Sequence, residues 1–92
     1  MVIQLLTLHF RLPGCRSLKE KRGRLRGIKD KFGKMTNVAV TESNLHDQHQ
    51  QAEWSVIIMA SNQTMVDRMI AQLELAIDQF DAILIKITRE RL

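Results

Sequence analysis

The strongest chemical signal in the sequence is a run of basic side chains between residues 16 and 34. Nine lysines and arginines there face only Glu20 and Asp30, so the segment carries +7 while the rest of the +4 chain carries −3. Such a separation creates a local positive potential that attracts phosphate-rich partners. A helix whose charges serve only solubility is the alternative interpretation. The side chains that we expect to contact nucleic acid are Arg16, Lys19, Lys21, Arg22, Arg26 and Lys29.

A second group of chemically capable residues is the sequence His46-Asp47-x-His49. Imidazole and carboxylate groups this close could bind zinc or nickel. A catalytic site would also require a third firm ligand or a base, such as His9 or Glu42. The segment is rich in glutamine, which favours a polar surface loop, and the chain has no phosphate-binding G-x-x-x-x-G-K-[ST] pattern. We therefore predict no enzyme activity, no metal site and no cofactor.

Cys15 is the single cysteine, so the chain cannot form an internal disulfide. This is consistent with a reducing cytoplasm. Its position near a helix start, beside Arg16, could acidify the thiol. The sequence offers no convincing histidine partner for a nucleophile, which favours a role as a small buried side chain.

The basic run must be positioned by a helix that follows a strand. Residues 2–12 alternate between apolar and polar, which predicts a strand with one buried side, and Pro13-Gly14 ends it. Ser17 and Glu20 have the spacing of a capping box. Five apolar residues of the helix fall on one arc, and Lys21 falls inside it, so Lys21 must reach an edge or hold a specific partner. The arc consists of Leu18, Leu25, Ile28, Phe32 and Met35.

Two glycines of this helix, Gly23 and Gly27, lie opposite the apolar arc on the side expected to be exposed. Each should cost the helix about 0.5–1 kcal/mol relative to alanine. With no side chain at these two positions, another backbone or a phosphate could approach the helix closely. The alternative is that the glycines only make the helix kinked and weakly stable.

The remaining pattern predicts a strand at 37–42, a polar loop at 43–51, a strand at 53–60, a helix that begins at Ser61-Asn62, and a strand at 82–88. The outer face of the second helix is acidic. The inward residues are Val38, Val40, Trp54, Val56, Ile58, Ala60, Val66, Met69, Ile70, Leu73, Ile77, Phe80, Ile83, Ile85 and Ile87.

This order predicts one ferredoxin-like α+β domain over residues 1–92, with a four-stranded antiparallel βαββαβ sheet and both helices on one face. The other face would expose ten residues, three of them too apolar to remain wet, and we expect a second copy to cover these three in a homodimer. No segment is apolar enough to span a membrane or to act as a signal peptide. The expected interface is Ile57, Met59 and Leu84, among the open-face residues Thr7, His9, Arg11, Glu53, Ser55, Lys86 and Thr88.

The segment L-P-G-C-R-S-L-K-E-K-R at residues 12–22 resembles the P-G-x-x-S-L-K-E-K-R signature of the YlxP-like bacterial proteins, a domain of unknown function. The resemblance implies a small cytoplasmic ferredoxin-like protein without an established activity. The genes of such proteins often lie near ribosome-maturation and translation-initiation genes, which implies an association with RNA. The likeness continues over the chain in Val40-x-Glu42, Asp47, Gln50, Ala52, Val56 and Ser61-Asn62.

Two functions remain open. The first is binding of structured RNA or ribosomal particles through the basic helix. The few aromatic residues are assigned to the core, so phosphates rather than stacked bases would carry the binding. The second is a homo-oligomeric scaffold without nucleic acid. It would be held by the open sheet face, or by pairing of the basic helix with the acidic outer face of the second helix, which carries Asp67, Glu74 and Asp78.

Overall fold

The structure is a computed structural model that describes residues 1–92. Its four strands form one antiparallel sheet in the order β2-β3-β1-β4. The predicted ferredoxin-like α+β architecture is therefore confirmed. The elements in chain order are β1 (Val2–Arg11), α1 (Leu18–Phe32), β2 (Val38–Asn44), β3 (Gln51–Ala60), α2 (Gln63–Ile77) and β4 (Ile83–Arg91).

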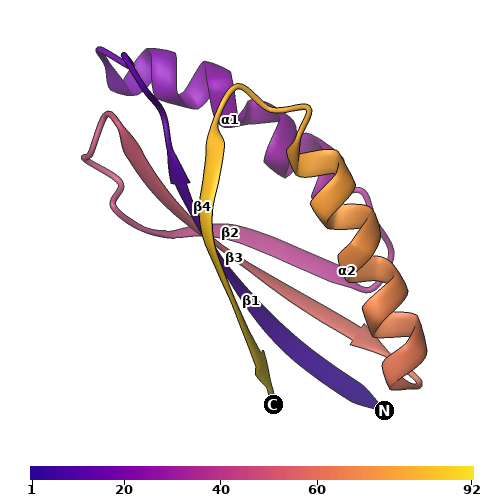
Figure 1. The fold of residues 1–92 in the computed structure, drawn as a ribbon. Helices are drawn as coiled ribbons and strands as arrows, with labels where there is room; N and C mark the ends of the chain where they lie inside the picture. Colours follow the sequence, from indigo (N-terminus) through magenta and orange to yellow (C-terminus); the bar gives the residue numbers. More distant parts are fainter.

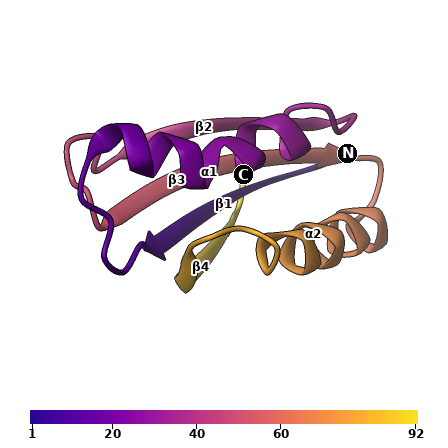
Figure 2. The same ribbon diagram turned by 90° about the horizontal axis from the view of Figure 1, so that it is seen from above.

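Both helices cover the same face of the twisted sheet (Figure 1). Seen from above, α1 lies toward the β2 edge and α2 toward the opposite edge (Figure 2). The core fills the space between them, because the inward residues of β1 and β3 meet the apolar stripes of the helices. The opposite face of the sheet is covered by no element of the chain.

The central strand β1 follows the predicted alternation. Leu6, Leu8 and Phe10 are buried against the helices, and the residues between them are partly exposed on the other face. One inward position is polar: Gln4 is 7% exposed, and its side-chain oxygen accepts a hydrogen bond of 3.2 Å from Gln63 Nε2 at the start of α2. A partner is required there because an unpaired buried amide costs about 1–3 kcal/mol.

Both helices begin at a polar cap, as the sequence predicts. Ser17 Oγ accepts a hydrogen bond of 3.0 Å from the Glu20 amide, and Asn62 Oδ1 accepts one of 2.9 Å from the Met65 amide. The return half of the predicted capping box is absent. The Glu20 carboxylate instead forms an ion pair of 2.9 Å with Arg24, one turn further along α1.

Several boundaries differ from the sequence prediction. The β2–β3 hairpin pairs further than expected, so Ser43 and Asn44 belong to β2, Gln51 belongs to β3, and the loop contains only residues 45–50. At the other end, α1 stops at Phe32, so Met35 packs against the core from beyond the helix.

The prediction for β4 is wrong in part, because a register shift lies between the partners of His9 and Phe10. Leu84 faces Phe10 on the core side, whereas Ile83 and Ile85 are 46% and 50% exposed. An extra residue at a bulge shifts the alternation of the strand that carries it. Of the three isoleucines predicted to point inward, Ile87 alone packs against the core.

Gly27 also departs from its predicted exposure. A Cβ atom on Gly27 would lie 2.8 Å from the ring of Phe80, whereas a Cβ on Gly23 would meet nothing within 4 Å. Phe80 follows the end of α2, and its ring packs edge-on against Phe32 with centroids 5.8 Å apart. Gly27 is thus a site of helix packing and is closed to a phosphate, and only Gly23 is open.

Candidate nucleic-acid interface

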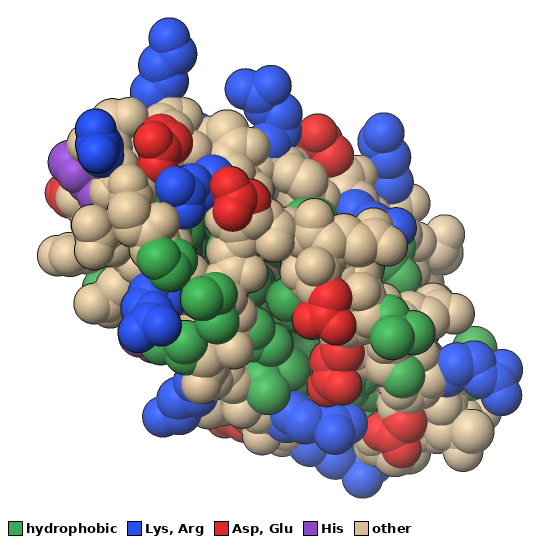
Figure 3. All heavy atoms as spheres, turned by 45° about the horizontal axis from the view of Figure 1, so that its top comes forward, with side chains coloured by type: hydrophobic (Ala, Val, Ile, Leu, Met, Phe, Trp, Pro, Cys, Tyr) green, Lys and Arg blue, Asp and Glu red, His purple; other side chains and the backbone are tan.

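The exposed flank of α1 carries five basic side chains that make no ion pair within the chain. Their spacing of three or four residues places them in one row along the helix, with Arg16 just before its cap. Lys and Arg side chains project over α1 at the top of the molecule with a few acidic side chains between them, and further Asp and Glu side chains lie lower down, over α2 (Figure 3). The row consists of Arg16, Lys19, Arg22, Arg26 and Lys29, all exposed.

Lys21 was predicted to contact nucleic acid, and the structure contradicts this. The residue is only 2% exposed, because it lies within the apolar arc of α1 that packs toward β2. Its Nζ donates a hydrogen bond of 2.7 Å to the Leu45 carbonyl and lies 3.5 Å from Glu42 Oε2. Of the two outcomes that the sequence allowed for Lys21, a specific partner is the one observed.

Arg24, on the other flank of α1, is also occupied. Its guanidinium pairs with Glu20 at 2.9 Å and with Asp81 at 3.5 Å, and it donates a hydrogen bond of 2.9 Å to the Pro13 carbonyl. Seven of the nine basic residues between 16 and 34 therefore remain without an ion-pair partner in the chain. The free positive surface is smaller than the formal charge of the segment and is concentrated on one flank.

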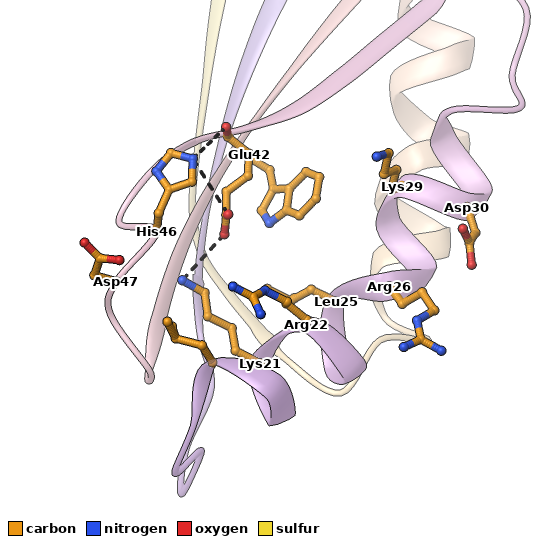
Figure 4. A pocket seen from close by; sticks show the side chains of 11 residues that line it. Lys21, Arg22, Leu25, Arg26, Lys29, Asp30, Glu42, His46 and Asp47 are labelled. Carbon is orange, nitrogen blue, oxygen red and sulfur yellow. Dashed lines mark hydrogen bonds and ion pairs between the residues drawn. The ribbon is translucent and has the colours of Figure 1, made fainter.

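A hollow of about 470 Å³ lies between α1 and the end of β2 with its following loop; we call it the α1–β2 groove. Arg22, Arg26 and Lys29 line it from α1, and Asp30 lies at the same wall (Figure 4). The β2 side and the loop supply two carboxylates and a histidine ring. The other lining residues are Leu18, Lys21, Leu25, Glu42, His46, Asp47 and Trp54.

Trp54 lines this groove, although the sequence analysis assigned it to the core. The side chain packs against the core and is partly exposed, because β3 places it next to Glu42 at the edge of the region that α1 covers. Its Nε1 is buried and has no hydrogen-bond partner within the chain. The alternation along β3 correctly predicted that Trp54 points to the helix side of the sheet. It could not predict that α1 leaves part of the Trp54 side chain exposed.

Glu42 connects α1 to the β2–β3 loop. Its carboxylate lies 3.5 Å from Lys21 Nζ and 3.8 Å from His46 Nε2, and its carbonyl lies 3.3 Å from the same His46 nitrogen (Figure 4). The Lys21 hydrogen bond to the Leu45 carbonyl fixes the loop from the other side. Leu45 has a positive φ of 60°, so this bond stabilises a backbone conformation that a leucine rarely adopts.

The three loop residues considered as metal ligands do not converge. His46 and Asp47 line the α1–β2 groove, whereas His49 lines a separate hollow next to Cys15, together with Asp47. His9 lies on the open face, 3.2 Å from Gln51 Oε1. No three His, Cys, Asp or Glu side chains form a group that could hold a metal ion.

Cys15 is buried, with its sulfur 3.5 Å from the Ser17 carbonyl. Burial raises the pKa of the thiol above its ordinary value, and a hydrogen bond to the Glu20 carboxylate raises it further. The same hydrogen bond, followed by the charge of Arg24, lowers the pKa of Glu20. An acidified thiol, which proximity to Arg16 had suggested, is therefore wrong, because desolvation exceeds the effect of nearby positive charge.

The open face of the sheet carries an apolar cluster at the end near the N-terminus. Ile57 and Met59 are 40% and 42% exposed, and they lie directly opposite Leu5 and Ile3 of β1. Leu84, the third residue predicted for this surface, faces the core instead, for the reason given above. Ile3 and Leu5 were missed, although their alternation with Leu6 and Leu8 places them on this face.

The fold and its one row of unpaired cations define a small ferredoxin-like α+β domain with a basic helix. The chain belongs to the DUF503 family, described as a protein of unknown function, whose model matches residues 3–89. A search of curated proteins found no match. No helix of the chain has both the length and the apolar character needed to cross a membrane.

Proposed function

We propose that this protein is a non-enzymatic cytoplasmic module that binds structured RNA or ribosomal particles through the exposed flank of α1. The observation that carries the proposal is the row of five basic side chains, none of them paired with a carboxylate of the chain. Lysine and arginine rows of this kind neutralise phosphates without reading sequence. Lys21 and Arg24 are excluded from this surface, because each already has partners.

The geometry of the row suits a phosphate backbone. From Lys19 to Lys29 the helix rises about 15 Å at roughly 1.5 Å per residue. Asp30 is the sole acid on this wall of the groove. No aromatic side chain stands on the row itself, so the contacts would be electrostatic and strongly dependent on salt.

The resemblance to YlxP-like proteins supports the same proposal from a different direction. The signature segment at residues 12–22 contains Arg16, Lys19 and Arg22, which form the first half of the row. The gene neighbourhood of such proteins suggests a role close to the ribosome. A cytoplasmic location would bring the row into contact with that partner.

The decisive experiment compares two variants with the same loss of charge. In one, Lys19, Arg22, Arg26 and Lys29 become Gln; in the control, the exposed and unpaired residues Arg11, Arg68, Lys86 and Arg91 become Gln. Binding to purified ribosomal subunits and to a structured RNA is measured between 50 and 300 mM salt. Circular dichroism verifies that both variants fold.

We expect the α1 variant to lose binding and the control to retain most of it. For the native chain, log K should fall with log salt by about 0.7–0.9 per phosphate neutralised. A salt-independent affinity, or equal losses in both variants, would contradict the proposal. In the second case net charge rather than the α1 row would govern the binding.

A homo-oligomeric scaffold is the second candidate, and the apolar cluster on the open face favours it. Ile3, Leu5, Ile57 and Met59 form a contiguous surface that a second copy could cover. Light scattering tests this with the native chain and with Ile57→Lys combined with Met59→Lys. A dimer that the double variant converts to a monomer supports the scaffold, and a strict monomer excludes it. A dimer would also double the basic surface, so both functions can coexist.

A further inference from the structure

We propose that the α1–β2 groove binds one nucleotide, with the phosphate on the α1 wall and a base that carries an exocyclic amino group against the opposite wall. The nucleotide is either free or an unpaired residue of an RNA chain. In the second case the inference rests on the proposed function and deepens it, because it adds a base-contacting site to a surface that otherwise binds only phosphates.

The α1 wall has the chemistry of a phosphate site. Arg22, Arg26 and Lys29 follow one another at spacings of four and three residues and line the groove along α1, with their charged ends pointing in different directions. All three are exposed and unpaired (Figure 4). Two guanidinium groups and an ammonium group along this wall provide the forked and point-like donors from which phosphate oxygens accept hydrogen bonds.

The opposite wall has a different character, which makes a bare phosphate or a second phosphate a poor occupant. Asp47 forms no ion pair and no side-chain hydrogen bond within the chain, and Glu42, whose carboxylate pairs with Lys21, lines the same side of the groove. Carboxylate oxygens only accept hydrogen bonds, so they favour a ligand edge with N–H donors. The amino groups of guanine, adenine and cytosine supply such donors, and uracil lacks an amino group.

The floor between the two walls is apolar and contains one unused donor. Leu18, Leu25 and Trp54 provide surface against which a flat base can pack, and aromatic contact with bases is a recurring feature of RNA recognition. Trp54 Nε1 has no acceptor within the chain although it is buried. Since an unpaired buried donor is unfavourable, a small movement of the Trp54 side chain that brought Nε1 to an acceptor atom of a bound base would stabilise the complex.

The volume of the groove is also appropriate. At about 470 Å³ it is within the range of pockets that hold small organic ligands. The combination of a cationic wall, an apolar floor and an acceptor wall is specific to a ligand that is itself divided into an anionic part, a flat part and an edge with donors. A nucleotide has this division, whereas an acidic peptide would oppose Asp47 and Glu42.

Trp54 provides a direct readout, because the chain has one tryptophan and no tyrosine. The native protein is titrated with GMP, AMP, CMP, UMP and inorganic phosphate while its tryptophan fluorescence is recorded. A short single-stranded RNA and a perfectly paired RNA are titrated in the same way. We expect saturable quenching by the amino-bearing nucleotides or by the single strand, weaker quenching with UMP, and little change with phosphate alone.

Three variants separate the contribution of the phosphate contacts to nucleotide binding from that of the base contacts. Arg26→Gln with Lys29→Gln should weaken nucleotide binding about tenfold, because it removes charge-assisted hydrogen bonds to the phosphate. Asp47→Asn should reduce the discrimination against UMP while leaving the phosphate contact in place. The matched control is Lys31→Gln with Lys34→Gln, since both lysines are exposed and neither lines the groove; it should bind like the native chain.

The outcomes separate this inference from the proposed function. If RNA binds to the α1 row without changing Trp54 fluorescence, and no nucleotide changes it, the groove inference is overturned while the proposed function stands. If nucleotides quench but RNA does not bind, the groove is a site for free nucleotides and the proposed function fails. Equal affinity for phosphate and nucleotides, or quenching by an acidic peptide alone, would also overturn the inference.

Discussion

The basic residues of α1 fall into two groups, which differ in whether they have partners within the chain. On the exposed flank, Arg22, Arg26 and Lys29 have no ion-pair partner within the chain, and they line a groove. Lys21 lines the same groove, but it is buried and bonded to a carbonyl and a carboxylate on the β2 side. Residues that are adjacent in sequence and identical in formal charge therefore have different roles. One group is available to a ligand, and the other fixes the β2–β3 loop to the helix.

The largest expected effect comes from breaking the buried region. Lys21→Ala should lower the free energy of unfolding by about 2–4 kcal/mol, because it leaves the Leu45 carbonyl and Glu42 without their partner. Lys19→Ala, on the exposed flank, should change it by less than about 0.5 kcal/mol. Urea denaturation measures both. Similar small losses in the two variants would show that the Lys21 contacts contribute no stability.

The exposed region is tested by the slope of RNA affinity against salt. Arg26→Gln should reduce the slope by about 0.7–0.9, because one phosphate contact is lost. Lys21→Met should leave the slope unchanged, since its ammonium group is already occupied in the native chain. The variants are compared by filter binding at several salt concentrations, and an equal reduction for Lys21→Met would erase the distinction between the two regions.

The two glycines of α1 extend the comparison between exposed and buried positions of this helix to side-chain packing. Gly23→Ala should raise stability by about 0.5–1 kcal/mol, because the position is open and alanine favours the helix. Gly27→Ala should lower it, because the added methyl group would meet the Phe80 ring, which is itself held against Phe32. Thermal melts decide the sign. A gain at both positions would mean that Phe80 moves aside at little cost.

The smallest expected effect concerns Cys15. The raised pKa of its thiol means that the folded state retains the proton to a higher pH than the unfolded state does. The corresponding stability is present below the unfolded pKa and is lost as the pH rises through the folded pKa, so it should decline above about pH 9. Urea melts at pH 7–10 measure this, with Cys15→Ala as the control that removes the decline.

The same burial predicts slow alkylation of Cys15 by iodoacetamide at pH 8 in the native chain and rapid alkylation in urea. Fast reaction of the folded protein would contradict the buried and protonated thiol.

Much of the fold was predictable because its signals are local. The alternation of Leu6, Leu8 and Phe10 and the caps Ser17 and Asn62 depend on neighbours a few residues away, and each is confirmed. The β4 bulge was not predictable from alternation. It moves Leu84 to the core side and leaves Ile83 exposed, and it depends on how β4 registers against β1.

The candidate site was predictable only in part. The row from Arg16 to Lys29 is visible in the sequence, because helical spacing places these residues together. The groove is not, since its second wall is contributed by Glu42 and Asp47, about twenty residues further along the chain. The sequence marked Lys21 as anomalous by its position within the apolar arc, but it could not name Leu45 and Glu42 as the partners.

By itself, the sequence determined which segments form helices and strands, where the helices begin, and that cations are concentrated on one early element, because these properties arise from interactions over a few residues. Tertiary structure alone decided which of those cations are neutralised, that Gly27 faces a ring, and that Trp54 lines a groove opposite basic side chains. Exposure and pairing depend on distances in space between residues far apart in the chain, and no local spacing encodes them.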